Sequence, residues 1–296
     1  MINNEIAVVV VTYNRLELLK QVVSGLLNQT LQPNKIIIVN NSSTDGTTEW
    51  LDALANEYAH ITIIKQENIG SSGGQYTGTK AAYEMGYEWI WIMDDDVVAT
   101  PDCLQNLMQF CKPDLVCHPL RISYDGEIFV GTDTAEINLT NPFKGLHKRI
   151  LTKSDYTKTA TIPVDVVTFE GPIFHYSMFE KVGFPDKKFF IYGDDTEFSI
   201  RLGKAGIRLE IITNAILNRL LPFEVMDFDN WKFYYIYRNM TAIDTLYGSI
   251  SVRLFRSFFR VLTRIFRCKN LSQIKTLLRA FYDGYFYKQE KEKLNN

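Results

Sequence analysis

The sequence predicts an α/β protein: a Rossmann-like mixed sheet flanked by helices, followed by a helical appendage at the carboxyl end. Over the first 120 residues, short β-branched runs alternate with apolar residues at helical spacing, which is typical of parallel strands joined by crossover helices. Near the carboxyl end, arginines and phenylalanines recur every three or four residues, which indicates helix. We expect one domain over residues 1–225, in halves 1–120 and 121–225, and a helical region over 226–296.

Runs of β-branched residues place strands at 6–12, 35–39, 61–65 and 88–93, and helical spacing places helices at 16–27 and 50–58. Thr100 followed by Pro101 is typical of a helix start, so we expect a helix over 102–111. The pattern weakens beyond residue 114, and 132–161 is expected to be an irregular loop. The second half is expected to contain a strand near 164, a helix at 177–182, a buried strand at 189–192, a helix from 194 and a strand at 208–212.

Composition excludes several classes of protein. The chain has 296 residues, of which 46% are hydrophobic and 22% charged, as expected of a soluble globular protein. Its net charge of −2 predicts no nucleic-acid partner. The first residues lack the segments of a signal peptide, and no apolar run reaches the roughly 18 residues of a membrane span, so we expect a cytoplasmic protein. The four cysteines have no CxxC spacing, which argues against a zinc site or a disulfide framework.

Polar clusters follow each of the first four predicted strands. Ligands of open parallel sheets bind beyond the carboxyl ends of the strands, so these clusters should line one crevice. The clusters are residues 12–15, 40–47, 68–74 and 94–96.

Three consecutive aspartates, Asp94, Asp95 and Asp96, follow the apolar strand at 88–93. Adjacent carboxylates at the end of a buried strand repel one another and need a cation. Mn²⁺ or Mg²⁺ prefers such oxygen ligands and would bridge them to a diphosphate. The alternative is a solvated acidic turn.

A second acidic pair, Asp194 and Asp195, opens a predicted helix. Asp194 would suffice as a helix cap, because carboxylates are favourable at helix N-termini. The aromatic run before it suggests a buried strand that delivers Asp195 into a pocket, where it would act as a general base. The spacing alone does not choose between base and cap.

Gly70, Gly73 and Gly74 precede a helical pattern and would let the backbone approach a nucleotide. Strand, glycine turn, helix, strand and then Asp94 is also the layout of a dinucleotide fold. That alternative fails in detail, because G-x-G-x-x-G is not matched and one ribose-binding acid would not explain three.

Taken in order, these motifs resemble those of family-2 glycosyltransferases of the GT-A fold. The resemblance covers about residues 5–220 and is closest to bacterial galactofuranosyltransferases, with rhamnosyltransferases next. It implies a nucleotide-sugar half over 1–120 and an acceptor half over 121–225. The motifs are VVVVTYNR (8–15), IIIVNNSSTDGT (36–47), ENIGSSGG (67–74), WIMDDDV (91–97) and FFIYGDDTEFSIRLGKAG (189–206).

The resemblance implies a role for each matching residue, in one inverting displacement with Asp195 as the base. Asp94 and Asp96 would hold Mn²⁺ or Mg²⁺. We expect the donor to be bound by Thr12, Tyr13, Arg15, Asn40, Asn68, Gly70, Gly73, Gly74, Asp94 and Asp95, and the acceptor by Gly171, His175, Tyr192 and Asp194. For His175 the alternative is a structural, partly buried histidine.

The sequence departs from the family pattern at two places. Galactofuranosyltransferases resembling this chain place a metal-binding histidine where Asn218 and Arg219 stand, and arginine does not ligate metals. Asn218 would then supply an oxygen ligand, or Arg219 would contact the diphosphate directly. Gly193 stands where close relatives carry a tryptophan, which implies a different acceptor pocket.

The segment 252–267 is predicted to be a basic amphipathic helix. Such a helix suits the surface of an anionic membrane, where a lipid-linked acceptor would be found. The alternative is a helix that packs its apolar face on the first domain. The arginines are Arg253, Arg256, Arg260, Arg264 and Arg267, and no acidic residue lies between Asp244 and Asp283.

The expected activity is transfer of a sugar, galactofuranose from UDP-galactofuranose in the first instance, to a hydroxyl of a lipid-linked or growing surface polysaccharide. The expected location is the inner face of the cell membrane, as a peripheral protein. A dTDP-rhamnose donor is the first alternative, because thymine and uracil present the same hydrogen-bonding edge. Alternatives from other classes are a non-catalytic scaffold subunit, with Arg219 marking lost metal chemistry, and a dinucleotide-dependent oxidoreductase.

Overall fold

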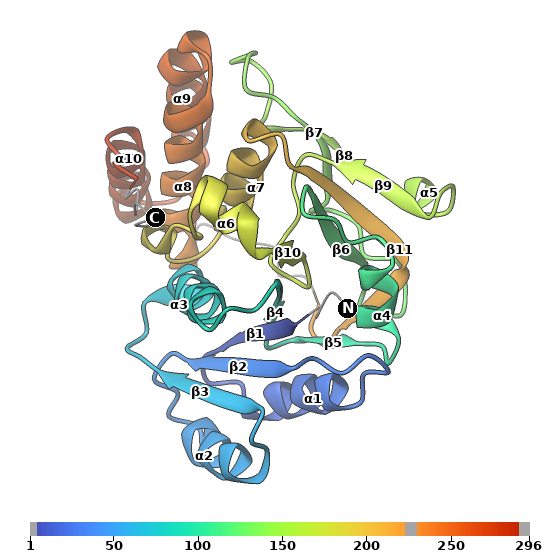
Figure 1. Cartoon of the computed structure of the whole chain (residues 1–296). Coiled ribbons are helices and arrows are strands. Elements are labelled where there is room, and N and C mark those ends of the chain that lie inside the picture. The colour runs from blue at the N-terminus through green and yellow to red at the C-terminus, as the bar shows by residue number, and fades with distance from the viewer. Residues whose placement is uncertain (1–4, 223–229, 290–296) are drawn as a thin grey trace.

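The computed structural model describes residues 5–222 and 230–289 and contains a nine-stranded mixed sheet (Figure 1). The strand order is β3-β2-β1-β4-β10-β6-β11-β5, and β9 pairs with β11. The predicted fold class is therefore confirmed. The strands are β1 (Ile6–Thr12), β2 (Lys35–Asn40), β3 (Ile61–Lys65), β4 (Trp89–Asp94), β5 (Val97–Ala99), β6 (Leu115–Ile122), β9 (Thr161–Val164), β10 (Ile173–His175) and β11 (Arg208–Arg219).

The first four strands are parallel and agree closely with the sequence prediction. Figure 1 shows α1 and α2 on one face of these strands and α3 on the other, as right-handed crossover connections require. The predicted helix at 102–111 is shorter than expected. The helices of this half are α1 (Leu16–Leu27), α2 (Thr47–Glu57), α3 (Gly70–Glu84) and α4 (Cys103–Met108).

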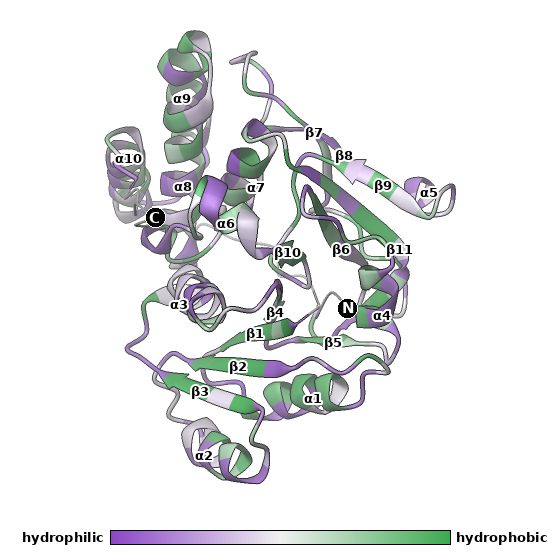
Figure 2. Cartoon of the chain, viewed as in Figure 1, coloured by the Kyte–Doolittle hydropathy of each residue, from purple (hydrophilic) through white to green (hydrophobic). Residues whose placement is uncertain are grey.

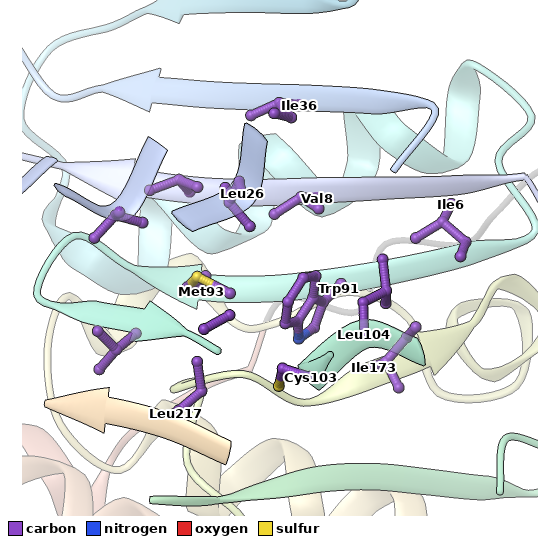
Figure 3. Close-up of a cluster of buried hydrophobic side chains, with 14 of the residues drawn as sticks. Ile6, Val8, Leu26, Ile36, Trp91, Met93, Cys103, Leu104, Ile173 and Leu217 are labelled. Carbon is purple, nitrogen blue, oxygen red and sulfur yellow. The ribbon is translucent and has the colours of Figure 1, made fainter. Parts of the chain in front are cut away.

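Two apolar layers cover the two faces of the sheet. Successive strand residues point to opposite faces, so Val8 and Trp91 contribute to the layer under α1 and α4, whereas Val9 and Ile92 contribute to the layer under α3. Figure 3 shows Trp91 at the centre of the first layer, beside Met93 and Cys103. Each large side chain removed from water stabilises the fold by about 1.5–3 kcal/mol. This burial fixes where each strand ends.

Beyond β4 the sheet changes direction. The short strand β10 runs antiparallel between β4 and β6, β11 is parallel to β6, and β5 returns antiparallel to β11. Strands β5, β6 and β10 were not expected from the sequence, and β11 ends at Arg219 rather than at residue 212. A register shift between Ile212 and Ile216 interrupts the alternation of β11, which explains why the pattern stopped there.

Two further expectations were wrong. The segment 132–161 is not an irregular loop but forms a hairpin of β7 (Thr134–Ile137) and β8 (His147–Ile150), followed by α5 (Lys153–Tyr156). Its pattern is weak because β8 is exposed on both faces. The segment 189–192 is not a strand. Phe189 ends a 3₁₀ turn, η1 (Lys187–Phe189), and a tight turn then leads into helix α7 (Asp194–Lys204). Helix α6 spans Tyr176–Val182.

The carboxyl-terminal region is helical, as predicted, and packs on the first domain beside α3 and α7 (Figure 1). The predicted boundary at 225/226 lies outside the described residues. Within the described part of the chain, no helix is long and apolar enough to span a membrane. The elements are α8 (Lys232–Tyr247), the π-helical turn η2 (Val252–Arg256), α9 (Ser257–Ile265) and α10 (Leu271–Tyr285).

The arginines of η2 and α9 lie differently from the sequence expectation. Arg256 is buried and pairs with Asp244 of α8 at 2.9 Å, and Arg260 pairs with the same carboxylate at 2.7 Å. The opposite, phenylalanine-rich side of this segment is exposed, and Figure 2 shows the mixed hydropathy of α9. The alternative in which the apolar face packs on the first domain is therefore wrong.

Candidate active site

The carboxyl ends of β1, β2 and β4 meet at one edge of the sheet. In the strand register Thr12 lies beside Asn40, and Val11 lies beside Asp94. The sequence therefore placed these three polar strand ends together correctly. Tyr13 follows β1 with its ring 46% exposed, and its backbone N–H donates to Asp95 Oδ2 at 3.3 Å.

Asn40 is buried and shapes the loop after β2. Its Oδ1 accepts from the Ser43 N–H at 2.9 Å, and its Nδ2 donates to Thr48 Oγ1 at 2.9 Å. Asn68 plays a similar local role, because its Oδ1 accepts from the Gly70 N–H at the start of α3, at 3.0 Å. Both amides thus organise loops at the crevice predicted for the donor.

Arg15 lies against the triple aspartate. Its Nη1 donates to Asp96 Oδ2 at 2.6 Å and to Asp95 Oδ1 at 3.1 Å. Burial raises the pKa of Asp95 to about 6, although Arg15 opposes the shift. Burial, then the charges of Asp96, Glu170 and Asp95, raise the pKa of Asp94 well above its usual value. One arginine therefore does not neutralise this cluster.

The donor set fits a hard divalent cation. Carboxylates whose pKa is raised by mutual repulsion gain most from added positive charge, and oxygen ligands suit Mn²⁺ and Mg²⁺. In the described residues, however, no group of three or more His, Cys, Asp or Glu is arranged to hold a metal ion. Asp95 and Asp96 face Arg15 instead.

The glycines at the start of α3 are needed for packing within the protein. Gly70 has φ +81°, and a Cβ there would lie 2.1 Å from the Phe190 carbonyl oxygen. A Cβ on Gly74 would lie 2.3 Å from Val11 Cγ1, and one on Gly73 would lie 2.5 Å from Ile69 Cγ1. These glycines thus seat α3 against β1 and against the turn before Asp194, rather than simply clearing space for a nucleotide.

The turn at 190–193 presents the second acidic pair. Phe190, Tyr192 and Gly193 all have positive φ, which turns the chain sharply into α7. Burial raises the pKa of Asp194 to about 7, with the charge of Asp195 next in importance. Burial also raises the pKa of Asp195 to about 6, while hydrogen bonds from Thr196 oppose the shift. Both carboxyls titrate close to neutral pH, as acid–base groups in active sites do.

Helix α3 joins the two acidic clusters. Ser72 donates its N–H to the Phe190 carbonyl at 3.2 Å, and a hydrogen bond from its side chain opposes the rise that burial causes in the pKa of Asp194. Gln75, one helical turn later, donates Nε2 to Asp94 Oδ1 at 3.3 Å. Residues three apart share one face of a helix, with Cβ atoms about 5–6 Å apart. The two acidic clusters therefore converge on the same face of α3.

A buried ion-pair network lies next to both clusters. It was not predicted from the sequence. Glu170 accepts from Arg219 Nη1 at 2.5 and 2.8 Å and from Arg121 Nη1 at 2.6 Å, and Arg121 also pairs with Asp133 at 2.5 Å. The charge of Glu170 contributes to the raised pKa of Asp94 and of Asp195. This network leaves little local signal in the sequence beyond Glu170 before Gly171-Pro172, because its ion-pair partners lie up to 49 residues apart.

Arg219 ends β11 beside the triple aspartate. The Leu220 N–H donates to the Asp96 carbonyl at 2.8 Å, so the strand end predicted to carry a metal ligand does lie at this site. Arg219 Nη1 is held by Glu170, with the guanidinium over the Phe129 ring at 4.4 Å. Asn218 is exposed, and strand alternation directs its side chain to the opposite face from Arg219.

Three residues that were expected to bind the acceptor lie in different places relative to the acidic clusters. His175 pairs with Trp89 at the amino end of β4, about 16 Å from Asp94 along the strand, and Ser177 Oγ lies 2.8 Å from its Nδ1. The structure does not bring His175 to the site, which favours the structural alternative. Gly171 is buried, and its carbonyl accepts from Trp91 Nε1 at 2.8 Å. Tyr192 remains next to Asp194, with Lys232 Nζ 5.8 Å from its ring centroid.

Comparison with known proteins finds glycosyltransferases of similar sequence. The galactofuranosyltransferase GlfT1 of Mycolicibacterium smegmatis is 26% identical over 209 residues, which cover 68% of this chain and 66% of that protein. The cholesterol galactosyltransferase of Borreliella burgdorferi is 31% identical over 121 residues, or 40% of this chain and 34% of that protein. The chain thus spans less than two thirds of the length of these relatives.

Solved structures support the fold. The structure of GalNAc-T7 with UDP, GalNAc and Mn²⁺ has a TM-score of 0.69 and 14% identity, and covers 96% of this chain and 56% of that one. The fold is therefore of the GT-A glycosyltransferase type. The family model described as "Glycosyl transferase family 2" matches residues 7–183, which is more than half of the sequence. This chain belongs to glycosyl transferase family 2.

Proposed function

We propose that this chain is an inverting glycosyltransferase that moves a sugar from a nucleoside diphosphate to a hydroxyl of a lipid-linked or growing surface polysaccharide. One observation carries the proposal: Ser72 and Gln75, three residues apart on α3, hydrogen bond through their side chains to Asp194 and to Asp94. The cluster at Asp94 would then stabilise the departing diphosphate, while a base from the acidic pair takes the proton of the acceptor hydroxyl that forms the new bond to the anomeric carbon.

Asp195 is the base in this proposal. Its Oδ1 accepts from the Thr196 N–H at 2.6 Å, so Oδ2 would take the proton of the acceptor hydroxyl. A base with pKa near 6 is ionised at neutral pH and still basic enough to assist proton removal. Holding both substrates in line supplies much of the remaining acceleration.

Asp94 and Asp96 would hold Mn²⁺ or Mg²⁺, which, when bound, neutralises charge on the departing diphosphate. Arg15 adds a fixed positive charge at the same place. The exposed Tyr13 ring and the loop held by Asn40 would receive the nucleoside. Uracil and thymine present the same edge to such a loop, so both UDP and dTDP donors fit.

The first candidate donor is UDP-galactofuranose. The support is the similarity to GlfT1, which is named a galactofuranosyltransferase. The GalNAc-T7 structure, which contains UDP and Mn²⁺, supports a uridine nucleotide and a divalent metal. A dTDP-rhamnose donor is the alternative.

A panel of UDP- and dTDP-sugars, assayed with lipid-linked acceptors and Mn²⁺, tests the activity. We expect transfer by the wild-type protein and none by Asp195→Asn, with donor-induced thermal stabilisation kept in the variant. Absence of transfer from every donor in the panel would count against the proposal.

A non-catalytic scaffold remains the second candidate, because Arg15 and Arg219 place fixed cations where metal chemistry is expected. The two candidates differ in cells. If Asp195→Asn leaves the surface glycan unchanged in a strain that lacks the wild-type gene, the scaffold is correct.

We further propose that the chain binds the inner face of an anionic membrane as a peripheral protein, through an exposed apolar patch on η2 and α9. The patch residues follow one helical stripe, and Phe143 from the β7–β8 hairpin extends it, with its ring 5.6 Å from that of Phe259. The patch consists of Phe143, Phe255, Phe258, Phe259, Leu262 and Phe266.

Charge favours lipid as the occupant of the patch. The surrounding sequence from 245 to 282 contains eight basic residues and no acidic one, and Arg267, Lys269 and Lys275 among them are exposed. Aromatic side chains entering the interface, with basic residues near anionic headgroups, are typical of interfacial helices. This differs from the sequence expectation, because Arg256 and Arg260 anchor the helix to Asp244 instead of contacting lipid.

Sedimentation with phosphatidylglycerol vesicles tests membrane binding. We expect Phe258→Asp combined with Leu262→Asp to abolish binding, whereas Tyr124→Asp, an exposed aromatic elsewhere, leaves it unchanged. Equal binding by both variants would disprove the role of the patch.

A further inference from the structure

Asn239 of α8 is buried beneath the turn that precedes the acidic pair. Its Nδ2 donates to the carbonyls of Phe189, Ile191 and Tyr192 at 3.0, 2.9 and 2.6 Å. Two N–H bonds are thus shared among three carbonyls of one turn. The sequence did not predict this contact, because the partners of Asn239 lie 47–50 residues away in the chain.

The turn that Asn239 contacts is one that the chain does not adopt readily. Phe190 and Tyr192 have φ values of +65° and +63°, a region that residues with side chains seldom occupy. Such a conformation persists only where surrounding groups hold it in place. The Phe189 carbonyl also accepts from the Ile191 N–H at 2.7 Å, whereas the Ile191 and Tyr192 carbonyls lie outside any sheet or helix and are hydrogen-bonded by Asn239.

Neighbouring residues of α8 reinforce the same contact. Arg238 Nη2 donates to the carbonyls of Lys188 and Phe189 at 2.6 and 2.8 Å. The ring of Tyr235 stacks on Phe190 with centroids 4.7 Å apart and an interplanar angle of 18°. From the opposite side, Ser72 donates to the Phe190 carbonyl at 3.2 Å. The turn is therefore held between α8 and the donor-side helix α3.

The geometry points to Asn239 as a positioning residue: we propose that its carboxamide fixes the 190–193 turn and thereby sets the direction of Asp194 and Asp195. The inference rests on the proposed function, since it assigns the role through Asp195. It also gives the carboxyl-terminal helices a catalytic purpose, because the group that orients the base comes from α8 and not from the matched family region at 7–183.

Steady-state kinetics of the full-length protein test the proposal. A base displaced by about 1 Å costs on the order of 10²-fold in rate, so we expect Asn239→Ala to lower kcat by about that factor. The KM for the donor should change little, because the strand ends and α3 that surround the donor site are not altered. Asn239→Asp keeps the shape but loses the donor N–H groups, and we expect it to be as impaired as Asn239→Ala.

Thr245→Val is the matched control. Thr245 also lies on α8, and its hydroxyl donates to Ala242 and Gly284 carbonyls, away from the turn. We expect it to lower the melting temperature and leave kcat unchanged. If Asn239→Ala does not fold, Arg238→Gln serves as the second variant. It removes the hydrogen bonds from Arg238 to the Lys188 and Phe189 carbonyls, and we expect it to reduce kcat several-fold.

Hydrogen exchange of the amides at 191–197 gives a readout that needs no turnover. We expect faster exchange in this segment in the Asn239 and Arg238 variants, and wild-type exchange in Thr245→Val. Unchanged exchange, or near wild-type kcat in Asn239→Asp, would overturn the proposal. If the wild-type protein transfers no sugar, the proposed function fails, while the exchange comparison still decides whether Asn239 fixes the turn.

Discussion

Glu170 holds Arg219 with both carboxylate oxygens, at 2.5 and 2.8 Å from Nη1, at the strand end where relatives are expected to carry a metal-binding histidine. Glu170 also pairs with Arg121, so one carboxylate compensates two buried or nearly buried guanidinium groups. Arg219 is therefore fixed in the wall of the site. Its positive charge acts on the site from a set position.

Glu170→Gln should destabilise the protein. Removing one member of a buried ion pair leaves uncompensated charge and costs about 3 kcal/mol in the free energy of unfolding. Glu136→Gln is the control, because Glu136 pairs with Lys148 at the exposed surface, where such pairs contribute less than about 1 kcal/mol. Urea denaturation of the three proteins measures both values. Equal losses in the two variants would show that the Glu170 network contributes no more than a surface pair.

The pH dependence of transfer should report Asp195. Its pKa is raised to about 6, so the base is ionised above pH 6 and protonated below it. We expect kcat to fall as the pH decreases through about 6. In Glu170→Gln this limb should move to lower pH, because the negative charge that helps to raise the pKa of Asp195 is gone. Glu136→Gln should keep the wild-type profile, and a limb that does not move in Glu170→Gln would contradict the assignment.

Gly70→Ala should disturb the turn at 190–193. The new Cβ would lie 2.1 Å from the Phe190 carbonyl oxygen at a residue with φ +81°. We expect a loss of about 2–4 kcal/mol in stability, from backbone strain and overpacking together, and a lower kcat. Gly86 is the control, because it has φ +86° and a Cβ there would meet open space. Gly86→Ala should therefore lower the stability by only about 1 kcal/mol and leave kcat intact. Thermal unfolding and kinetics compare the pair; similar effects of the two variants would argue against contact with the turn.

The sequence predicted the first half of the fold, over residues 1–120, better than the second half, for physical reasons. Strands β1 to β4 are buried parallel strands whose apolar runs end in polar loops, so Thr12, Asn40 and Asp94 could be placed from local pattern alone. The turn at 190–193 could not, because an aromatic run reads as a strand unless the contacts of Asn239 are known.

The sequence left open which side of α9 faces the protein, for the same reason. Its arginines and phenylalanines predicted an amphipathic helix, and that periodicity is real. Which stripe faces the protein depends on Asp244, a single buried carboxylate on another helix that pairs with Arg256 and Arg260. Long-range ion pairs of this kind leave no periodic signal in the chain.

Arg15 offers the final prediction, because it would compete with the proposed metal ion for the same carboxylates. Its Nη1 lies 2.6 Å from Asp96 and 3.1 Å from Asp95. In Arg15→Gln these carboxylates lose the ion pair with Arg15, and their repulsion grows. Free Mn²⁺ should then bind several-fold more tightly, since the added ion replaces the missing charge.

The nucleotide should respond in the opposite direction. Arg15 places positive charge where the diphosphate is proposed to bind, so the variant should bind UDP more weakly at saturating Mn²⁺. Isothermal titration of Mn²⁺ alone, and of UDP with Mn²⁺, separates the two effects. Lys20→Gln is the control, because Lys20 lies on α1 and pairs with Glu17 at the exposed surface, and it should change neither affinity. Weaker Mn²⁺ binding in Arg15→Gln would mean that Arg15 supports the metal site instead of competing with the ion.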